Sequence, residues 1–286
     1  MTPIAALCVN RMKINSGSLV HQIRAWLKAR GWQTVVWETE YYAGGGTAAE
    51  EEQDISFVLS LGGDGTVLEV AREAARQEIP VLGVNYGRLG FLCEVEQTDI
   101  FSALERILQS DFTVEERLML TACLLNGEPD RTVSRVPFRG FTVLNDVVFA
   151  RKSTDAMIAL DVKLTGETIA SPPCDGVIIA TPTGSTAYSL SAGGPVVSPG
   201  VEAILITHLA AHALSSRPMV VSHKDVLDVT LACAHPCRVA FDGQNSLILQ
   251  PGQTVRIKAS DLKARFIRFA GSNFPKMVRE KLGERS

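Results

Sequence analysis

Residues 55–66 read Ile-Ser-Phe-Val-Leu-Ser-Leu-Gly-Gly-Asp-Gly-Thr, an apolar run that leads directly into a glycine-rich turn. The apolar run has the length and composition of a buried strand, and residues 67–77 after the turn have the pattern of a helix. Open α/β sheets bind their ligands at such places, beyond the carboxyl end of a strand. Because glycines let the backbone approach a phosphate and the start of a helix offers its amides, we expect this turn to hold phosphate groups.

The segments around this turn alternate between strand-like and helix-like patterns, which is typical of a parallel sheet covered by helices. The strand-like segments are residues 4–9, 34–37, 55–61 and 81–84, and the helix-like segments are residues 16–30, 67–77 and 98–108. The alternation predicts an N-terminal doubly wound parallel α/β domain over residues 1–110.

The pattern changes after this first domain, because most of the segments that follow favour strands separated by turns. Residues 111–265 are therefore predicted to form an all-β, sandwich-like domain. Residues 266–286 form a C-terminal segment in which residues 277–282 have a helical pattern, and we expect this terminal helix to pack back on the first domain.

Composition excludes several classes of protein. The chain has 286 residues, of which 46% are hydrophobic, and this length suits about two domains. Its 28 Lys and Arg against 31 Asp and Glu give a net charge of -3, which lacks the basic signature of a nucleic-acid binder. No apolar stretch reaches the roughly 18 residues that span a bilayer, so no membrane partner is expected. The start is a poor signal peptide and the six scattered cysteines argue against a disulfide framework, so we expect a cytoplasmic enzyme.

The carboxylate of Asp64 is unusual in a phosphate-binding turn, because it would repel a bare phosphate. It would be useful there if it bound Mg²⁺ or took a proton from an attacking hydroxyl, and both roles belong to phosphoryl transfer. A simpler interpretation is a tight turn in which Asp64 caps the helix. The P-loop and G-x-G-x-x-G motifs are absent from the sequence, so any phosphate site here is of another kind.

A second signal lies in residues 181–188, which read Thr-Pro-Thr-Gly-Ser-Thr-Ala-Tyr and follow an apolar, strand-like run. Hydroxyls and open amides can line a polar groove, and Tyr188 adds an aromatic face for a base. Helix capping explains one or two of these hydroxyls but not the whole run.

Together, these segments resemble the NAD kinase family, in its bacterial type that uses ATP or polyphosphate. The turn at residues 62–66 and the segment 181–188 are similar to the two signatures of that family, and Asn145-Asp146 stands where the family has an Asn-Glu pair. Further similar segments are Asn85 to Leu92, Leu214 to Pro218 and Phe241 to Gln244. The resemblance covers about residues 55 to 245 in order.

The resemblance implies transfer of a terminal phosphoryl group from ATP or polyphosphate to the 2′-hydroxyl of the adenosine ribose of NAD, which gives NADP. It implies that Asp64 is the general base and that Mg²⁺ or another divalent cation assists, with no metal site built from protein ligands. The donor phosphates would contact Gly62, Gly63, Gly65 and Thr66. The nucleotide contacts would be Asp64, Gly65, Asn145, Asp146, Asp175, Thr186, Ala187, Tyr188, Ser189, Ser191 and Gln244. In this family part of the NAD site can come from a neighbouring subunit, which implies a homodimer or homotetramer.

The sequence departs from the family's pattern in three places, and two other functions are alternatives. His208 and Ala211 replace prolines that are common in the family. Asp146 is one methylene shorter than the usual Glu, and Pro173 stands where charged or polar residues are common. A lipid kinase of the diacylglycerol or sphingosine type shares the Gly-Gly-Asp-Gly-Thr turn, but it should show an apolar lipid gate. A dinucleotide-binding sensor would have lost catalysis, and the intact Asp64 argues against this. The residues favour neither ATP nor polyphosphate, and neither NAD nor NADH.

Overall fold

The computed structural model describes residues 2–9, 17–37, 54–86, 90–126, 140–152, 156–170, 173–210, 217–271 and 274–283. The contacts divide the chain into two compact units, which are described separately below. The first consists of Met1–Glu116 and Lys263–Ser286, and the second of Arg117–Leu262. The domain ranges 1–110, 111–265 and 266–286 that we expect from the sequence remain a prediction.

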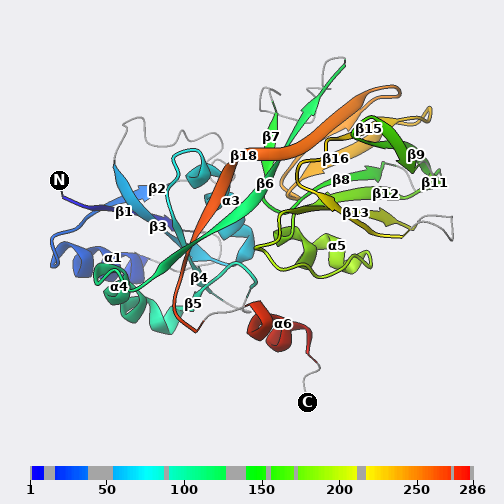
Figure 1. Ribbon diagram of the computed structural model, residues 1–286. Coiled ribbons are helices and arrows are strands. Elements are labelled where there is room, and N and C mark those ends of the chain that lie inside the picture. The colour runs from blue at the N-terminus through cyan, green and yellow to red at the C-terminus, as the bar shows by residue number, and fades with distance from the viewer. Residues whose placement is uncertain are drawn as a thin grey trace. The chain divides into compact units, whose positions relative to one another are not determined.

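The first unit is built on a parallel sheet, as the sequence predicts (Figure 1). Its strands lie in the order β2-β1-β3-β4, and β5 pairs in parallel with β4. The last residues of β18 also pair in parallel with β4, through Phe266 and Val81. The bounds are β1 Ile4–Val9, β2 Gln33–Trp37, β3 Ile55–Gly62, β4 Val81–Asn85, β5 Val95–Glu96 and β18 Thr254–Arg268.

Helices cover both faces of this sheet. The helices α1 (Gly17–Lys28) and α4 (Ile100–Leu108) pack on one face, where Leu27 and Leu104 share a core with Leu59. A short 3₁₀ turn, η1 (Gln97–Asp99), leads into α4. The helix α3 (Asp64–Ala75) packs on the other face, where Gly83 leaves room for Val67. This arrangement confirms the doubly wound α/β domain.

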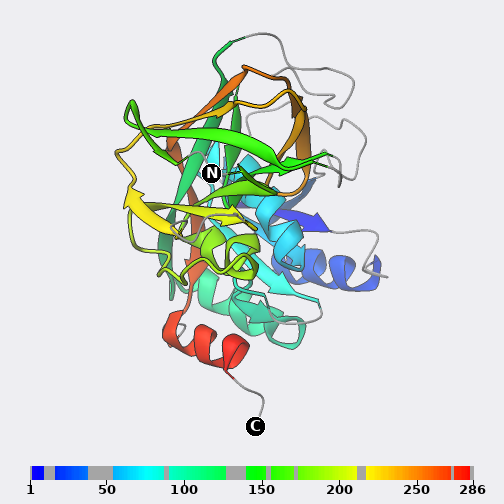
Figure 2. The same ribbon diagram turned by 90° about the vertical axis from the view of Figure 1, so that its right-hand side faces the viewer.

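The terminal helix α6 (Phe274–Leu282) belongs to the first unit, as the sequence predicts, and is drawn in red in Figure 2. It begins three residues before the expected start at residue 277. Proline suits the first turn of a helix, so Pro275 extends the element rather than ending it.

The second unit is a sandwich of two antiparallel sheets. One sheet has the strand order β14-β13-β12-β8-β16-β17. Its bounds are β8 Asp146–Arg151, β12 Gly176–Ala180, β13 Ala203–Leu209, β14 Met219–Ser222, β16 Cys237–Phe241 and β17 Asn245–Leu249.

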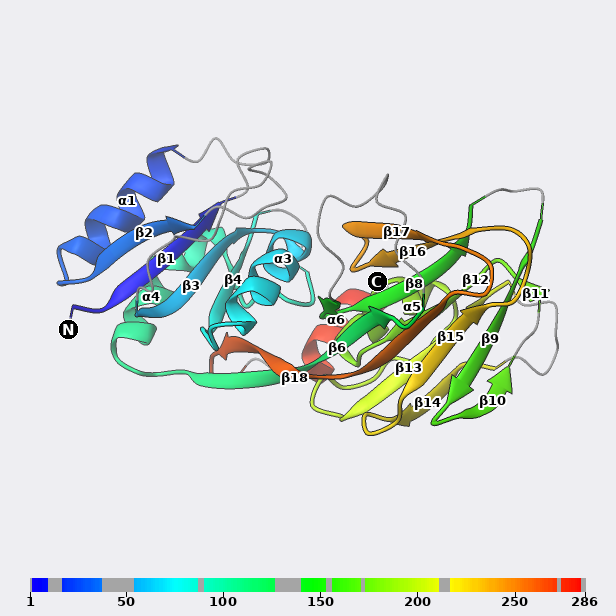
Figure 3. The same cartoon turned by 90° about the horizontal axis from the view of Figure 1, so that it is seen from above.

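The other sheet contains β10, β9 and β15, followed by the first half of β18, and β11 pairs with β9. The strand β6 pairs with β7 and with β18, and the long strands β6 and β18 can be followed in Figure 3. The bounds are β6 Thr113–Leu124, β7 Phe141–Val143, β9 Ile158–Leu164, β10 Glu167–Ala170, β11 Pro173–Cys174 and β15 Leu227–Leu231.

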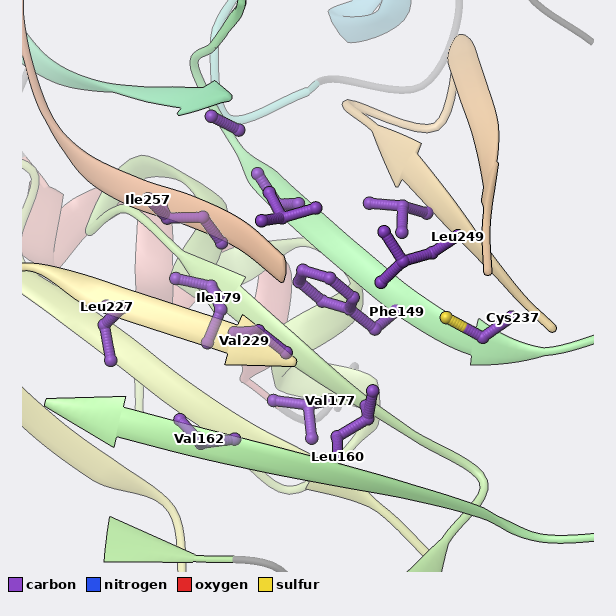
Figure 4. Packing of buried hydrophobic residues seen from close by; sticks show 14 of the residues in the cluster. Phe149, Leu160, Val162, Val177, Ile179, Leu227, Val229, Cys237, Leu249 and Ile257 are labelled. Atoms are coloured by element: carbon purple, nitrogen blue, oxygen red, sulfur yellow. The ribbon is translucent and has the colours of Figure 1, made fainter. Parts of the chain in front are cut away.

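Alternate residues of both sheets form the core of the sandwich (Figure 4). Phe149 of β8 and Ile179 of β12 point into this core from one sheet, and Val162 and Val229 do so from the other. The opposite face of the first sheet carries a smaller cluster, in which Ile178 and Leu205 pack against residues after β12. The segment that follows β12 therefore lies on the outer face of this sheet. Among the helices that the structure describes, none is long and apolar enough to cross a membrane.

Candidate active site

The glycine-rich turn lies where the sequence predicts, between the end of β3 and the start of α3. Gly62 ends the strand, Gly63 precedes the helix, and Asp64 is the first residue of α3. The amides of Thr66 and Val67 bond to the carbonyl of Gly63 at 2.9 and 3.1 Å, which closes the first turn of the helix. Gly63, which has no side chain, holds the N-cap position, so Asp64 is not the N-cap residue of α3.

The carboxylate of Asp64 contacts a second segment, which comes after β4. The Phe91 amide donates to its Oδ2 at 2.6 Å, and the Leu92 amide donates to its Oδ1 at 3.1 Å. A Cβ placed on Gly90 would overlap this carboxylate, so the glycine leaves the space that the carboxylate fills. We call residues 90–93 the clamp, because they fix the position of Asp64.

The last clamp residue, Cys93, adds a third donor. Burial raises the pKa of the Cys93 thiol to about 12, and the charge of Asp64 and a hydrogen bond to it act in the same direction. The thiol is therefore protonated at neutral pH and donates to the carboxylate. Two amides and one thiol hold Asp64 in one orientation.

In the second unit, Asp242 organises the start of β8. Its carboxylate accepts the amides of Leu144 at 3.0 Å, Asn145 at 2.7 Å and Asp146 at 3.1 Å. The Asp242 amide donates in return to the carbonyl of Asp146 at 2.9 Å. Gln244 lies two residues further along, and its amide bonds to the carbonyl of Phe241 at 3.1 Å. The structure thus brings Asn145, Asp146 and the turn with Gln244 together.

The segment after β12 packs against the same place. The Thr181 hydroxyl donates to the carbonyl of Leu144 at 2.5 Å and accepts the Gly184 amide at 3.0 Å. A Cβ on Gly184 would overlap the carbonyl of Asn145, so only a glycine fits there without a shift. These contacts fix η2 (Thr183–Thr186) and α5 (Tyr188–Ser191) beside Asn145.

The hydroxyls of this segment divide into those used inside the fold and those near its surface. Ser189 is fully buried and shares a hydrogen bond of 3.0 Å with Thr207 on β13. Thr186 is half-buried, and its hydroxyl donates to the carbonyl of Thr183 at 3.2 Å. Ser191 is exposed, and Tyr188 is 48% exposed, so its ring can stack on a ligand.

Asp175 lies apart from the other candidate residues of its unit. In the register of β8 and β12, Ala180 is opposite Asp146 and Gly176 is opposite Ala150. Asp175 is therefore at the other end of these strands from Asp146, about 17 Å away along the strand direction. Its carboxylate forms an ion pair with Arg151 at 3.0 Å.

Asp146 is 5% exposed, and its carboxyl group lies close to the charge of Asp242. Burial, and then the repulsion by Asp242, raises the pKa of Asp146 to about 7. The group is therefore poised to change its charge near neutral pH, in the part of the second unit where several candidate residues meet.

This raised pKa makes the stability of the protein depend on pH. Between the ordinary value of 3.8 and about 7, the folded chain holds a proton on Asp146 that the unfolded chain has released. The free energy of unfolding should therefore fall as the pH rises through this window. Asp146→Asn should remove this fall, so it should be more stable than wild type at pH 8 by on the order of 4 kcal/mol. Urea unfolding at several pH values measures the difference, which should vanish near pH 4; a difference independent of pH would contradict the prediction.

Several of these contacts have little signal in the sequence. The Asp-Gly pair at residues 242–243 is a sequence signal for a turn. The structure agrees with that signal, because Asp242 and Gly243 both have positive φ values. The clamp residues Phe91 and Leu92 use their backbone amides, which any residue type supplies. Residues 87–89 and 214–216, which carry part of the resemblance, lie outside the described residues.

Within the described ranges, no group of three or more His, Cys, Asp and Glu side chains is placed to hold a metal ion. A divalent cation at this site would have to share its ligands with a bound nucleotide. Mg²⁺ commonly binds in this way, through one or two carboxylates, waters and substrate phosphates. The single carboxylate of Asp64 beside the glycine-rich turn fits that pattern.

The comparisons with known proteins agree on one family. The ATP-NAD kinase N-terminal domain matches residues 6–112, and the ATP-NAD kinase C-terminal domain matches residues 144–269. An NAD kinase of Heliobacterium modesticaldum is 40% identical over 231 residues, which are 80% of this chain and 79% of that protein.

Solved structures show the same fold. The crystal structure of an NAD kinase from Archaeoglobus fulgidus in complex with ATP has a TM-score of 0.75 and 25% identity, over 98% of this chain and 97% of the other. Yeast NADH kinase complexed with NADH has a TM-score of 0.82 and 23% identity, over 100% and 89% of the two chains. With both domains matched and relatives about 40% identical over most of the chain, this protein belongs to the NAD kinase family.

Proposed function

We propose that this chain is an NAD kinase, which transfers the terminal phosphoryl group of ATP to the 2′-hydroxyl of the adenosine ribose of NAD. The observation that carries the proposal is the placement of Asp64, which stands in the glycine-rich turn with its carboxylate held by the clamp. The family comparisons support NAD kinase and give no support to a lipid kinase.

In the proposed mechanism Asp64 is the general base. The oxygen of the 2′-hydroxyl attacks the terminal phosphorus of ATP, and its proton passes to a carboxylate oxygen of Asp64. The bond between that phosphorus and the bridging oxygen breaks, and ADP leaves with its electron pair. A carboxylate has about four lone-pair positions, so the two amides and the thiol of the clamp leave one for this proton.

The donor phosphates are proposed to lie against Gly62, Gly63, Gly65 and Thr66. Support comes from the helix start, where a Cβ on Gly63 or Gly65 would meet nothing within 4 Å and where the helix dipole favours negative charge. Mg²⁺ is proposed to arrive with the nucleotide and to be held by its phosphates. When bound, it would reduce the negative charge of the phosphates.

The residues proposed to contact NAD include Asp64 and Gly65 of the first unit. The other proposed contacts form a cluster within the second unit. That cluster consists of Asn145, Asp146, Thr186, Ala187, Tyr188, Ser189, Ser191 and Gln244. The exposed ring of Tyr188 supports a stacking role for it. The hydroxyl of Ser189 already shares a hydrogen bond with Thr207. Ser189 would therefore lie against the ligand without donating a hydrogen bond to it.

Asp175 is proposed to contact the nicotinamide side of NAD. We also propose a homodimer or homotetramer, in line with the family that the chain resembles, and light scattering that gives a monomer mass would contradict it. We also place the enzyme in the cytoplasm, which its six free cysteines support and which cell fractionation tests.

The experiment that tests the function is a panel of donors and acceptors with purified protein. The donors are ATP and polyphosphate, and the acceptors are NAD, NADH, diacylglycerol and sphingosine, all with Mg²⁺. An NADP-specific dehydrogenase should detect the product from NAD. A panel that phosphorylates only a lipid, or nothing, would overturn the proposal.

A further inference from the structure

The terminal helix α6 places one lysine in an unusual setting. The Nζ atom of Lys281 is buried and has no hydrogen-bond partner in the part of the chain that the structure describes. It lies 4.4 Å from the centroid of the Phe91 ring, in a cation–π contact. Phe91 belongs to the clamp, and its amide donates to Asp64.

The charges around this ammonium connect it to the same carboxylate. Burial lowers the pKa of Lys281, and the negative charge of Asp64 acts against this more strongly than the other groups that face it, Cys93 and Glu280. The charge of Lys281 also acts on the Cys93 thiol. Lys281, the clamp and Asp64 therefore form one cluster within the first unit.

A purely structural role does not fully explain why the ammonium of Lys281 is buried. A lysine in the last turn of a helix interacts favourably with the helix dipole. Such a lysine commonly keeps its ammonium in water, because burying an ammonium without an acceptor is costly. The long side chain of Lys281 instead brings its charge over Phe91, beside the clamp.

A phosphate in the glycine-rich turn would complete this cluster. The donor phosphates of the proposed function lie against residues 62–66, directly beside Asp64. The carboxylate would repel them, and a nearby ammonium would offset that repulsion. A phosphate oxygen is also the acceptor that Lys281 lacks, and a lysine commonly binds phosphate as a point charge.

We propose that Lys281 of the terminal helix binds the phosphates of the nucleotide donor, together with the glycine-rich turn. This inference rests on the proposed function for the position of the donor. It adds to that function a cation from the end of the chain, and it makes the terminal helix a part of the donor site.

The test compares Lys281→Met with Lys281→Arg and with a matched control, Lys276→Met. Lys276 is an exposed lysine on the same helix, so its replacement removes the same charge from α6. Calorimetry measures the binding of inorganic tripolyphosphate and of ATP with Mg²⁺, which requires no turnover. Kinetics with NAD measures the KM for each substrate. If Lys281→Met fails to fold, Lys281→Gln takes its place.

Lys281→Met should weaken tripolyphosphate and ATP binding by about tenfold or more, because a charge-assisted hydrogen bond is lost. It should raise the KM for ATP in the same proportion and leave the KM for NAD nearly unchanged. Lys281→Arg should restore much of the binding, and Lys276→Met should bind as wild type. A merely structural lysine would lower the melting temperature without separating the two KM values.

The outcomes separate this inference from the proposed function. Weaker tripolyphosphate binding in Lys281→Met supports the inference even if no variant makes NADP. Unchanged binding in Lys281→Met overturns it even if the wild type is an active kinase. A wild-type chain that binds neither tripolyphosphate nor ATP also overturns it, and an increase in the KM for NAD alone would assign Lys281 to the acceptor instead.

Discussion

Asp64→Asn should lower kcat for NADP formation by about 10³-fold or more, because its amide cannot take the proton of the 2′-hydroxyl. The change keeps the size and shape of the side chain, so substrates should still fit. A loss that appears in kcat rather than in KM is the expected sign of a missing base. Steady-state kinetics with NAD and ATP varied in turn measures both constants.

The same variant should remain folded. The asparagine oxygen can still accept one of the two clamp amides, but its NH₂ group faces the other amide, which loses its acceptor, so the cost is about 2 kcal/mol. The melting temperature should therefore fall by about 4–8 °C for a chain of this size. Asp225→Asn is a matched control, because the carboxylate of Asp225 also accepts a backbone amide, from Ser222 at 3.0 Å. Activity of Asp64→Asn close to that of this control would show that Asp64 is not the base.

Gly90→Ala should lower kcat by about 10²-fold, because the added methyl group would take the space of the Asp64 carboxylate. The carboxylate would have to leave the clamp amides, which moves the base away from its reacting position. The backbone of Gly90 does not have a positive φ, so alanine itself causes no strain there. The loss would therefore come from the displaced carboxylate and not from a misfolded turn.

Two comparisons identify the cause of that loss. Gly200→Ala is the matched control, because a Cβ at this exposed position meets nothing within 4 Å and its activity should equal wild type. The double variant with Asp64→Asn should be no less active than Asp64→Asn alone, since both changes act on the same group. A further loss in the double variant would contradict the proposed link between Gly90 and Asp64.

The elements of the first unit could be predicted from the sequence, because each leaves a local pattern. The apolar run of β3 and the glycines after it give the strand, the turn and the start of α3, and the structure confirms all three. The expectation of a β-sandwich after the first domain is confirmed in the same way by the alternation along the strands that contain Phe149 and Val162.

The contacts that fix the candidate site could not be predicted, because they join residues far apart in the chain. The clamp lies 27 residues after Asp64, and Asp242 lies 98 residues after the Leu144 amide that it accepts. Hydrophobic patterns do not report such pairs, and the clamp in particular uses backbone amides. This is also why the sequence left helix capping open as a role for Asp64, and only its contacts decided the question.

The proposed donor site accounts for the low net charge of -3. An enzyme that handles two polyanionic nucleotides does not need a broad basic surface when the amides of a helix start hold the phosphates. In the proposed arrangement one lysine, Lys281, offsets the carboxylate of Asp64 where the donor approaches. Because this positive charge comes from a single residue, the overall composition of the chain does not reveal it.

The most direct test of this account is a single reaction in which both products are measured. Purified protein is incubated with NAD, ATP and Mg²⁺, and NADP and ADP are determined over time. The account predicts that both products appear in equal amounts with the wild-type chain, and that both disappear with Asp64→Asn. A wild-type chain that binds both nucleotides and forms no NADP would contradict it.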